Sequence, residues 1–151
     1  MINEKFMDAA IKQAIIGANK YDEVPIGAVI VKDGKIIAKA HNEKEKKHCA
    51  NYHAEMVAIN KACKVIGDWR LTGCDIYITL EPCPMCVGAL INARIDNIYF
   101  GAYDEKAGAL ESRCLLMEYK FNHYAHYIGG IEKEKCAKIL SDYFKGKRGT
   151  K

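Results

Sequence analysis

Hydrophobic side chains recur at helical spacing near both ends of the chain. Residues 4–18 carry apolar side chains four positions apart in two rows, one starting at Phe6 and the other at Met7. Residues 132–144 show a similar pattern. Apolar residues that recur every three or four positions share one face of a helix. The pattern therefore predicts an amphipathic helix at each end.

Short runs rich in β-branched and aromatic residues lie between these two helices. Residues 26–31 and 35–40 flank the pair Asp33-Gly34. Asp-Gly between two such runs is typical of a β-hairpin with a type I′ turn. We expect three further strands or extended segments, near residues 75–79, 97–100 and 124–128.

Two more helices are predicted to start at residues that can bind a metal. One follows His53 and runs over residues 54–64, and the other starts near Cys83, directly after Pro82. Alternating strands and helices indicate a layered α/β domain. A chain of 151 residues is long enough to bury a sizeable core, so we expect residues 1–151 to form one domain.

The segments around these helix starts offer one imidazole, two thiols and a carboxylate. Cys83 and Cys86 are three positions apart, so on a helix they share one face. A helix N-terminus favours the thiolate form, which binds metals. Together with His53 they supply three ligands, and a catalytic zinc site leaves its fourth position open for water. Glu55, two positions after His53, is poorly placed as a ligand and better placed to carry protons.

Other uses of these residues stay open at this point. A Cys-x-x-Cys pair can also be a redox pair or half of a structural zinc site, and Cys49 or Cys74 could complete such a site. The presence of both motifs, each at a predicted helix start, favours a catalytic metal.

Composition is that of a small cytoplasmic enzyme. Half of the residues are hydrophobic, and no apolar run approaches the 18 or so residues that span a membrane. The N-terminus lacks the pattern of a signal peptide, and seven cysteines, an odd number, suit a reducing compartment. A net charge of +4 allows a nucleic-acid partner without requiring one. The basic tail from about residue 145 is expected to be frayed.

The His-x-Glu and Pro-Cys-x-x-Cys motifs together form the signature of zinc-dependent nucleobase deaminases. The chain resembles the cytidine/deoxycytidylate deaminase superfamily, and within it the bacterial tRNA-specific adenosine deaminases, which make inosine at the wobble position. The resemblance runs over residues 21–148. It is carried mainly by residues 24–28, 41–42, 53–55, 69–71, 77–83, 100–102, 121–123 and 140–144.

This resemblance implies a three-layer α-β-α sandwich around a mixed sheet of about five strands. It implies one Zn²⁺ per subunit, bound by His53, Cys83 and Cys86, with Glu55 as the catalytic acid and base. It also implies a homodimer in which both subunits shape the site, and a tRNA anticodon loop as partner, with no membrane association.

The resemblance assigns substrate contacts to six residues. Asn42 and the backbone N–H of Ala54 would contact the base, while Asp104 and Lys106 would contact the RNA from a loop. Phe121 and Asn122 would hold splayed bases by stacking and polar contacts. From the residues alone, Asn42 could be a turn residue, Asp104 and Lys106 a solvated turn, and Phe121 part of the core.

The chain departs from the family pattern at Tyr52, where the family has a smaller residue, and at residues 110–114, where the loop is shorter. An alternative is therefore a diverged deaminase of a free base or nucleoside, such as guanine, cytosine, cytidine or adenosine. A non-enzymatic zinc-binding module is a third possibility, and it would make Glu55 dispensable.

Overall fold

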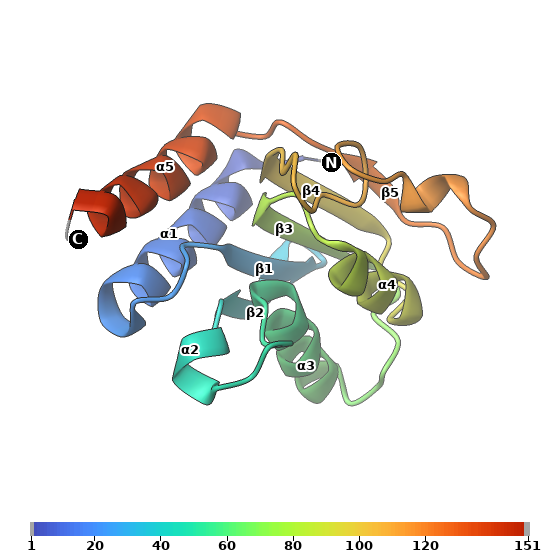
Figure 1. Ribbon diagram of the computed structural model, residues 1–151. Coiled ribbons are helices and arrows are strands. Elements are labelled where there is room, and N and C mark those ends of the chain that lie inside the picture. Colours follow the sequence, from blue (N-terminus) through green and yellow to red (C-terminus); the bar gives the residue numbers. More distant parts are fainter. Residues whose placement is uncertain (1, 150–151) are drawn as a thin grey trace.

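The computed structural model describes residues 2–149, which fold around a five-stranded mixed sheet (Figure 1). The strand order is β2-β1-β3-β4-β5. The strands are β1 (Gly27–Lys32), β2 (Lys35–His41), β3 (Cys74–Leu80), β4 (Asn97–Ala102) and β5 (His126–Ile128). β1 is antiparallel to both of its neighbours, whereas β3, β4 and β5 run parallel.

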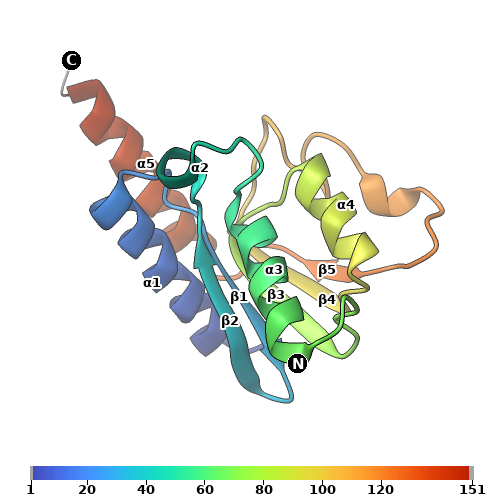
Figure 2. The same ribbon diagram turned by 90° about the horizontal axis from the view of Figure 1, so that it is seen from below.

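Helices cover both faces of this sheet, which confirms the expected three-layer sandwich. α1 and α5 lie on one face, and α3 and α4 lie on the other (Figures 1 and 2). The helices are α1 (Glu4–Tyr21), α2 (Lys44–Lys47), α3 (Ala54–Ile66), α4 (Pro84–Asn92), the 3-10 helix η1 (Leu116–Glu118) and α5 (Lys133–Gly149). Within residues 2–149, no helix is both long and apolar enough to cross a bilayer.

The central strands β1, β3 and β4 are buried on both faces, which explains their nearly continuous hydrophobic sequences. In β1, Ala28 and Ile30 pack into the core shared with α3 and α4. Val29 and Val31, which alternate with them, pack into the second core beneath α1 and α5. Each central strand therefore stabilises both layers of helices.

The β1–β2 hairpin has the turn that its sequence predicts. Asp33 and Gly34 have φ angles of 51° and 75°, and a type I′ turn requires positive φ at both central positions.

The C-terminal segment differs from the sequence-based expectation. The pattern predicts a helix over residues 132–144, but α5 continues to Gly149. The Tyr143 hydroxyl donates to the Asp22 carbonyl at 3.0 Å, and the Lys147 ammonium pairs with the Asp22 carboxylate. These contacts to the end of α1 explain why the helix extends beyond residue 144; residues 150 and 151 lie outside the described part.

The topology brings several chain segments to one edge of the sheet. β1 is antiparallel to β2 and β3, so β2, β3 and β4 all point the same way and their carboxyl ends meet. Ligands of open α/β sheets bind outside the carboxyl ends of strands. Here these ends lead into Asn42, into residues 81–83 and into the loop 103–112.

Candidate functional site

Three potential metal ligands converge at this edge. The Nδ1 atom of His53 lies 3.6 Å from the Cys83 Sγ and 3.5 Å from the Cys86 Sγ. All three ligand atoms lie within 4.8 Å of one another. Two ligands of a tetrahedral zinc ion at usual bond lengths are about 3.6 Å apart, so this donor set fits zinc. Within residues 2–149, neither Cys49 nor Cys74 joins a cluster of this kind.

Helix starts hold two of these ligands in place. His53 is the N-cap residue of α3, and Cys83 is the N-cap residue of α4, both with extended backbone angles. Pro84 follows at the first position of α4, where its missing N–H costs nothing. Cys86 lies one turn further along and is buried. Both cysteines therefore sit where the helix dipole favours negative charge.

The electrostatics suit cation binding. The hydrogen bond from the Cys86 thiol, together with a smaller effect of His53, outweighs burial and lowers the pKa of Cys83 to about 4. The same hydrogen bond, together with burial, raises the pKa of Cys86, which is the donor. Contact with Cys83 raises the pKa of His53. The site thus favours a thiolate at Cys83.

Glu55 lies beside this cluster in the first turn of α3. Only 4% of its surface is exposed, and burial raises its pKa to about 7. Its carboxyl group contacts the Cys86 thiol. A carboxyl group with a pKa near neutrality can both accept and donate a proton at physiological pH.

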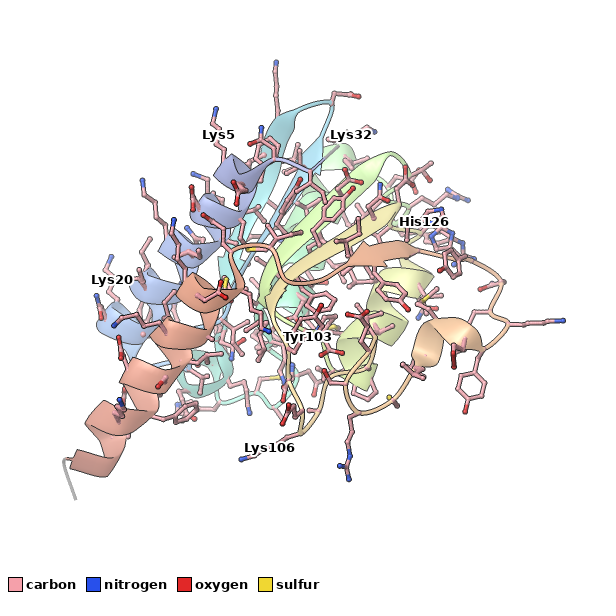
Figure 3. All side chains as sticks on the ribbon, turned by 90° about the horizontal axis from the view of Figure 1, so that it is seen from above. Lys5, Lys20, Lys32, Tyr103, Lys106 and His126 are labelled. Atoms are coloured by element: carbon pink, nitrogen blue, oxygen red, sulfur yellow. The ribbon has the colours of Figure 1, made fainter. Side chains whose placement is uncertain are left out.

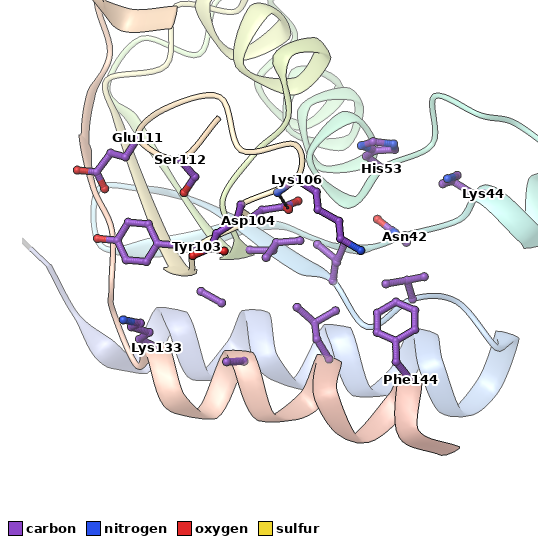
Figure 4. A pocket seen from close by; sticks show the side chains of 17 residues that line it. Asn42, Lys44, His53, Tyr103, Asp104, Lys106, Glu111, Ser112, Lys133 and Phe144 are labelled. Carbon is purple, nitrogen blue, oxygen red and sulfur yellow. Dashed lines mark hydrogen bonds between the residues drawn. The ribbon is translucent and has the colours of Figure 1, made fainter. Parts of the chain in front are cut away.

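A cavity of about 1060 Å³ opens next to His53, between α5 and the loops at the sheet edge (Figure 4). Four predicted site residues line it together: Asn42, His53, Asp104 and Lys106. The charges around it balance, with three lysines (Lys44, Lys106, Lys133) against three acids (Asp104, Glu105, Glu111). Its size lies just above the usual range for small-molecule sites, about 300–1,000 Å³.

Several lining residues were not identified from the sequence. Those with polar or aromatic side chains are Lys44, Tyr103, Glu105, Glu111, Ser112, Lys133 and Phe144. Figure 4 shows Tyr103 and Lys133 at one end of the cavity, and Asn42 and Phe144 at the other. Phe144 belongs to a segment that carries the family resemblance, and this resemblance could have identified it from the sequence. The others come from a loop and from helix starts whose position depends on the tertiary fold.

Asn42 and Ala54 are both predicted to contact the base, and in the structure they form a hydrogen bond with each other. The Ala54 N–H donates to Asn42 Oδ1 at 2.8 Å, and both residues are buried. His53 makes no side-chain cap of its own, so Asn42 caps α3 from another part of the chain. A contact between the Ala54 amide and a base would compete with this bond.

Asp104 and Lys106 both belong to the loop 103–112, which follows β4. Asp104 Oδ1 accepts from the backbone N–H groups of Lys106 at 3.1 Å and Ala107 at 3.2 Å. Asp104 therefore shapes the turn as well as lining the cavity. Lys106 lies at the rim of the molecule in Figure 3, well apart from Lys5 and Lys20 on α1.

Phe121 and Asn122 do not line this cavity. They border a separate hollow beside α4, together with Met85 and Gly88. Phe121 is 47% exposed, so it is not a core residue. Tyr52, one of the departures from the family pattern, also lies away from the cavity, in a shallow hollow next to Val57 on α3.

Glu81, immediately before Pro82, has a role that the sequence did not reveal. Its side chain is 2% exposed and accepts hydrogen bonds from the loop 103–112. Burial raises the pKa of this carboxyl, but hydrogen bonds led by those from Ser112 outweigh it, and the net pKa is below its ordinary value.

Comparisons with known proteins agree with this geometry. The model of the MafB19-like deaminase family matches residues 2–148. The tRNA-specific adenosine deaminase of Bacillus subtilis (strain 168) is 46% identical over 150 residues, which cover 99% of this chain and 92% of that protein.

Two solved structures are also similar. One comes from work on A-to-I editing by tRNA:A34 deaminases at the wobble position of transfer RNA. It superposes with a TM-score of 0.88 and is 40% identical in sequence, and the match covers 91% of this chain and 100% of the other. The guanine deaminase of Bacillus subtilis has a TM-score of 0.66 and 44% identity, covering 68% of this chain and 66% of the other. Similarity of this extent over nearly the full length means that the chain belongs to the MafB19-like deaminases, in the family of the tRNA-specific adenosine deaminases.

Proposed function

We propose that this protein hydrolyses adenosine to inosine at the wobble position of tRNA, using one zinc ion per subunit. The observation that carries the proposal is the buried carboxyl of Glu55 beside the cluster of His53, Cys83 and Cys86, next to a cavity. The relatives named above for tRNA deamination support the choice of substrate.

The donor set of His53 Nδ1 and the two cysteine sulfurs would hold the zinc ion. Bound zinc polarises water and can lower its pKa to about 7. The three protein ligands leave a tetrahedral ion one further position.

Glu55 would then move the protons of the reaction. It would take a proton from the attacking water as the oxygen adds to C6 of adenine, and give it to the ring nitrogen N1. In a second transfer Glu55 would move the proton of the new C6 hydroxyl to the 6-amino group, which would leave as ammonia, so that C6 becomes the carbonyl of hypoxanthine. Burial, which raises the pKa of Glu55, favours a carboxyl group that can give a proton as well as take one.

The cavity would hold the reacting nucleotide and its neighbour. An adenosine in an anticodon loop must be splayed out of its stack before it can reach a buried site. Asn42 would contact the base, and Asp104 and Lys106 would contact the ribose or phosphate. Tyr52 lies outside the cavity, so its size is compatible with this substrate.

We also propose a homodimer that acts in the cytoplasm. Phe121 and Asn122 border a hollow outside the cavity of their own chain, where they could contribute to the site of a partner subunit. Light scattering should give about twice the chain mass of 16.9 kDa. The mass of a monomer would contradict this part of the proposal.

A deamination assay tests the main proposal. The purified protein would be incubated with an anticodon stem-loop that carries adenosine at the wobble position, and the product would be identified by mass. The same stem-loop with guanosine at that position is the substrate control, and Glu55→Gln is the enzyme control. Inosine formed only from the adenosine stem-loop, and only by the wild type, is the expected result.

A second candidate is deamination of a free base, because the match to a guanine deaminase reaches 44% identity over two thirds of the chain. Guanine, cytosine, cytidine and adenosine would be offered in parallel. Turnover of one of these without turnover of the stem-loop would favour this candidate. A bound metal with no turnover at all would favour a non-enzymatic zinc module.

A further inference from the structure

The loop 103–112 forms one side of the cavity, yet it contains no helix or strand. Tyr103, Asp104, Lys106, Glu111 and Ser112 all line the cavity from this loop. A segment without regular secondary structure needs other partners for its backbone N–H groups.

The buried carboxylate of Glu81 supplies these partners at both ends of the loop. At the start of the loop, the N–H of Asp104 donates to Glu81 Oε1 at 3.1 Å. At the end, Glu81 Oε2 accepts three N–H groups: Leu110 at 3.1 Å, Glu111 at 2.8 Å and Ser112 at 3.0 Å. The Ser112 hydroxyl also donates to Glu81 Oε1. One side chain therefore holds the start and the end of the loop together.

The loop also fits tightly around this carboxylate. A Cβ atom at Gly108 would lie 2.3 Å from Glu81 Cδ, so glycine allows the loop backbone to approach the carboxylate. The N–H of Ala109 donates to the Pro82 carbonyl at 2.8 Å. Because Pro82 precedes the ligand Cys83, the loop is attached to the same segment that carries the metal ligand.

We propose that Glu81 is a positioning residue that holds the loop 103–112 in its substrate-binding conformation relative to the metal ligands. The inference rests on the proposed function, since it takes the loop 103–112 to contact the parts of the substrate other than the reacting base. Loops that are ordered before binding spare the substrate the entropic cost of ordering them. Removal of the carboxylate should therefore weaken substrate binding more than it slows the chemical step.

The test compares Glu81→Ala with Asp68→Ala in the full-length, metal-loaded protein. Asp68 is a suitable control because its carboxylate also accepts a backbone N–H, that of Arg70 at 3.0 Å. It lies beyond the opposite end of α3 from His53. Three quantities would be measured: metal content, hydrogen–deuterium exchange of loop amides, and separate kcat and KM values.

For Glu81→Ala we expect unchanged metal content and faster exchange at the amides of residue 104 and residues 110–112. KM should rise about tenfold or more, with kcat changed much less. Asp68→Ala should match the wild type in all three measurements. Glu81→Gln keeps one carbonyl oxygen for the three N–H groups at the end of the loop, so it should recover part of the KM loss.

If Glu81→Ala does not fold, a milder variant replaces it. Ser112→Ala removes one hydrogen bond to the carboxylate. It should shift exchange and KM in the same direction. Loop exchange equal to that of the wild type, loss of metal, or a fall in kcat with unchanged KM would overturn the inference.

The exchange measurement needs no substrate, so it separates this inference from the proposed function. A wild type that acts only on a free base would refute the tRNA proposal. Faster hydrogen–deuterium exchange of the loop amides in Glu81→Ala would still show that Glu81 holds the loop in place. KM would then be measured with that base, and an unchanged KM would overturn the role in substrate binding.

Discussion

Substitution of Asn42 separates its role in the fold from its proposed role in substrate binding. The buried Asn42 Oδ1 accepts the N–H of Ala54 at 2.8 Å and so caps α3, the helix that starts after His53 and carries Glu55. Asn42→Ala removes both the oxygen acceptor and the amide donor. Asn42→Asp keeps an oxygen acceptor at the same position, but it removes the donor and adds a negative charge.

The expected magnitude follows from the burial of this contact. Loss of an N-cap costs about 1 kcal/mol, and an unpaired buried N–H costs about 1–3 kcal/mol. We therefore expect Asn42→Ala to lower the free energy of unfolding by about 2 kcal/mol. For a chain of 151 residues this lowers Tm by about 4–8 °C. Asn42→Asp should stay within about 1 kcal/mol of the wild type, because a negative charge is favourable at a helix N-terminus.

Urea unfolding and steady-state kinetics would be measured on both variants with equal metal loading. If the amide of Asn42 donates to the base, both variants should lose about tenfold to a hundredfold in kcat/KM. The stable Asn42→Asp variant is the more informative one, since its loss of activity cannot come from unfolding.

Two results would refute this reasoning. An unfolding free energy of Asn42→Ala within about 0.5 kcal/mol of the wild type would show that the bond to Ala54 does not stabilise α3. Full activity in Asn42→Asp would show that no donor from Asn42 contacts the substrate.

Three further predictions follow from the described contacts. Glu55→Gln should retain its metal and lose at least about 10²-fold in kcat, measured together with metal content; near-wild-type turnover would exclude Glu55 as the proton carrier. Gly27→Ala should lower stability by about 1–3 kcal/mol in urea unfolding, because its Cβ would lie 1.9 Å from the Ala10 carbonyl oxygen, while Gly146→Ala, in open space, should not. Burial raises the pKa of Glu132 above its ordinary 4.5, so the folded state holds that proton more tightly and stability should fall as pH rises from about 4.5 through the raised pKa. Glu132→Gln should make this slope shallower in unfolding curves measured from pH 4.5 to 8, where the raised pKa of Glu55 contributes a slope of the same sign, and an unchanged slope would contradict the assignment.

Local patterns were sufficient to predict the sheet and its main helices. The turn at Asp33-Gly34 and the two ligand-bearing helix starts depend on a few neighbouring residues, so their signals lie within short stretches of sequence. The short helix α2 and the 3-10 helix η1 were not predicted, because four or three residues carry no periodicity. The end of α5 was misjudged because it depends on a contact with Asp22, distant in the sequence.

The candidate metal ligands and Glu55 could be proposed from the sequence because the chemistry needs those residue types at that spacing. Most residues in the walls of the cavity could not. The anchoring role of Glu81 depends on a loop that starts more than 20 residues later, and Phe144 reaches the cavity only because α5 packs beside α1. Hydrophobic periodicity and ligand chemistry are short-range properties, so the sequence by itself determined the layered fold and the candidate metal ligands. Loop conformation and cavity shape are set by hydrogen bonds between distant segments, and only the tertiary structure decided those.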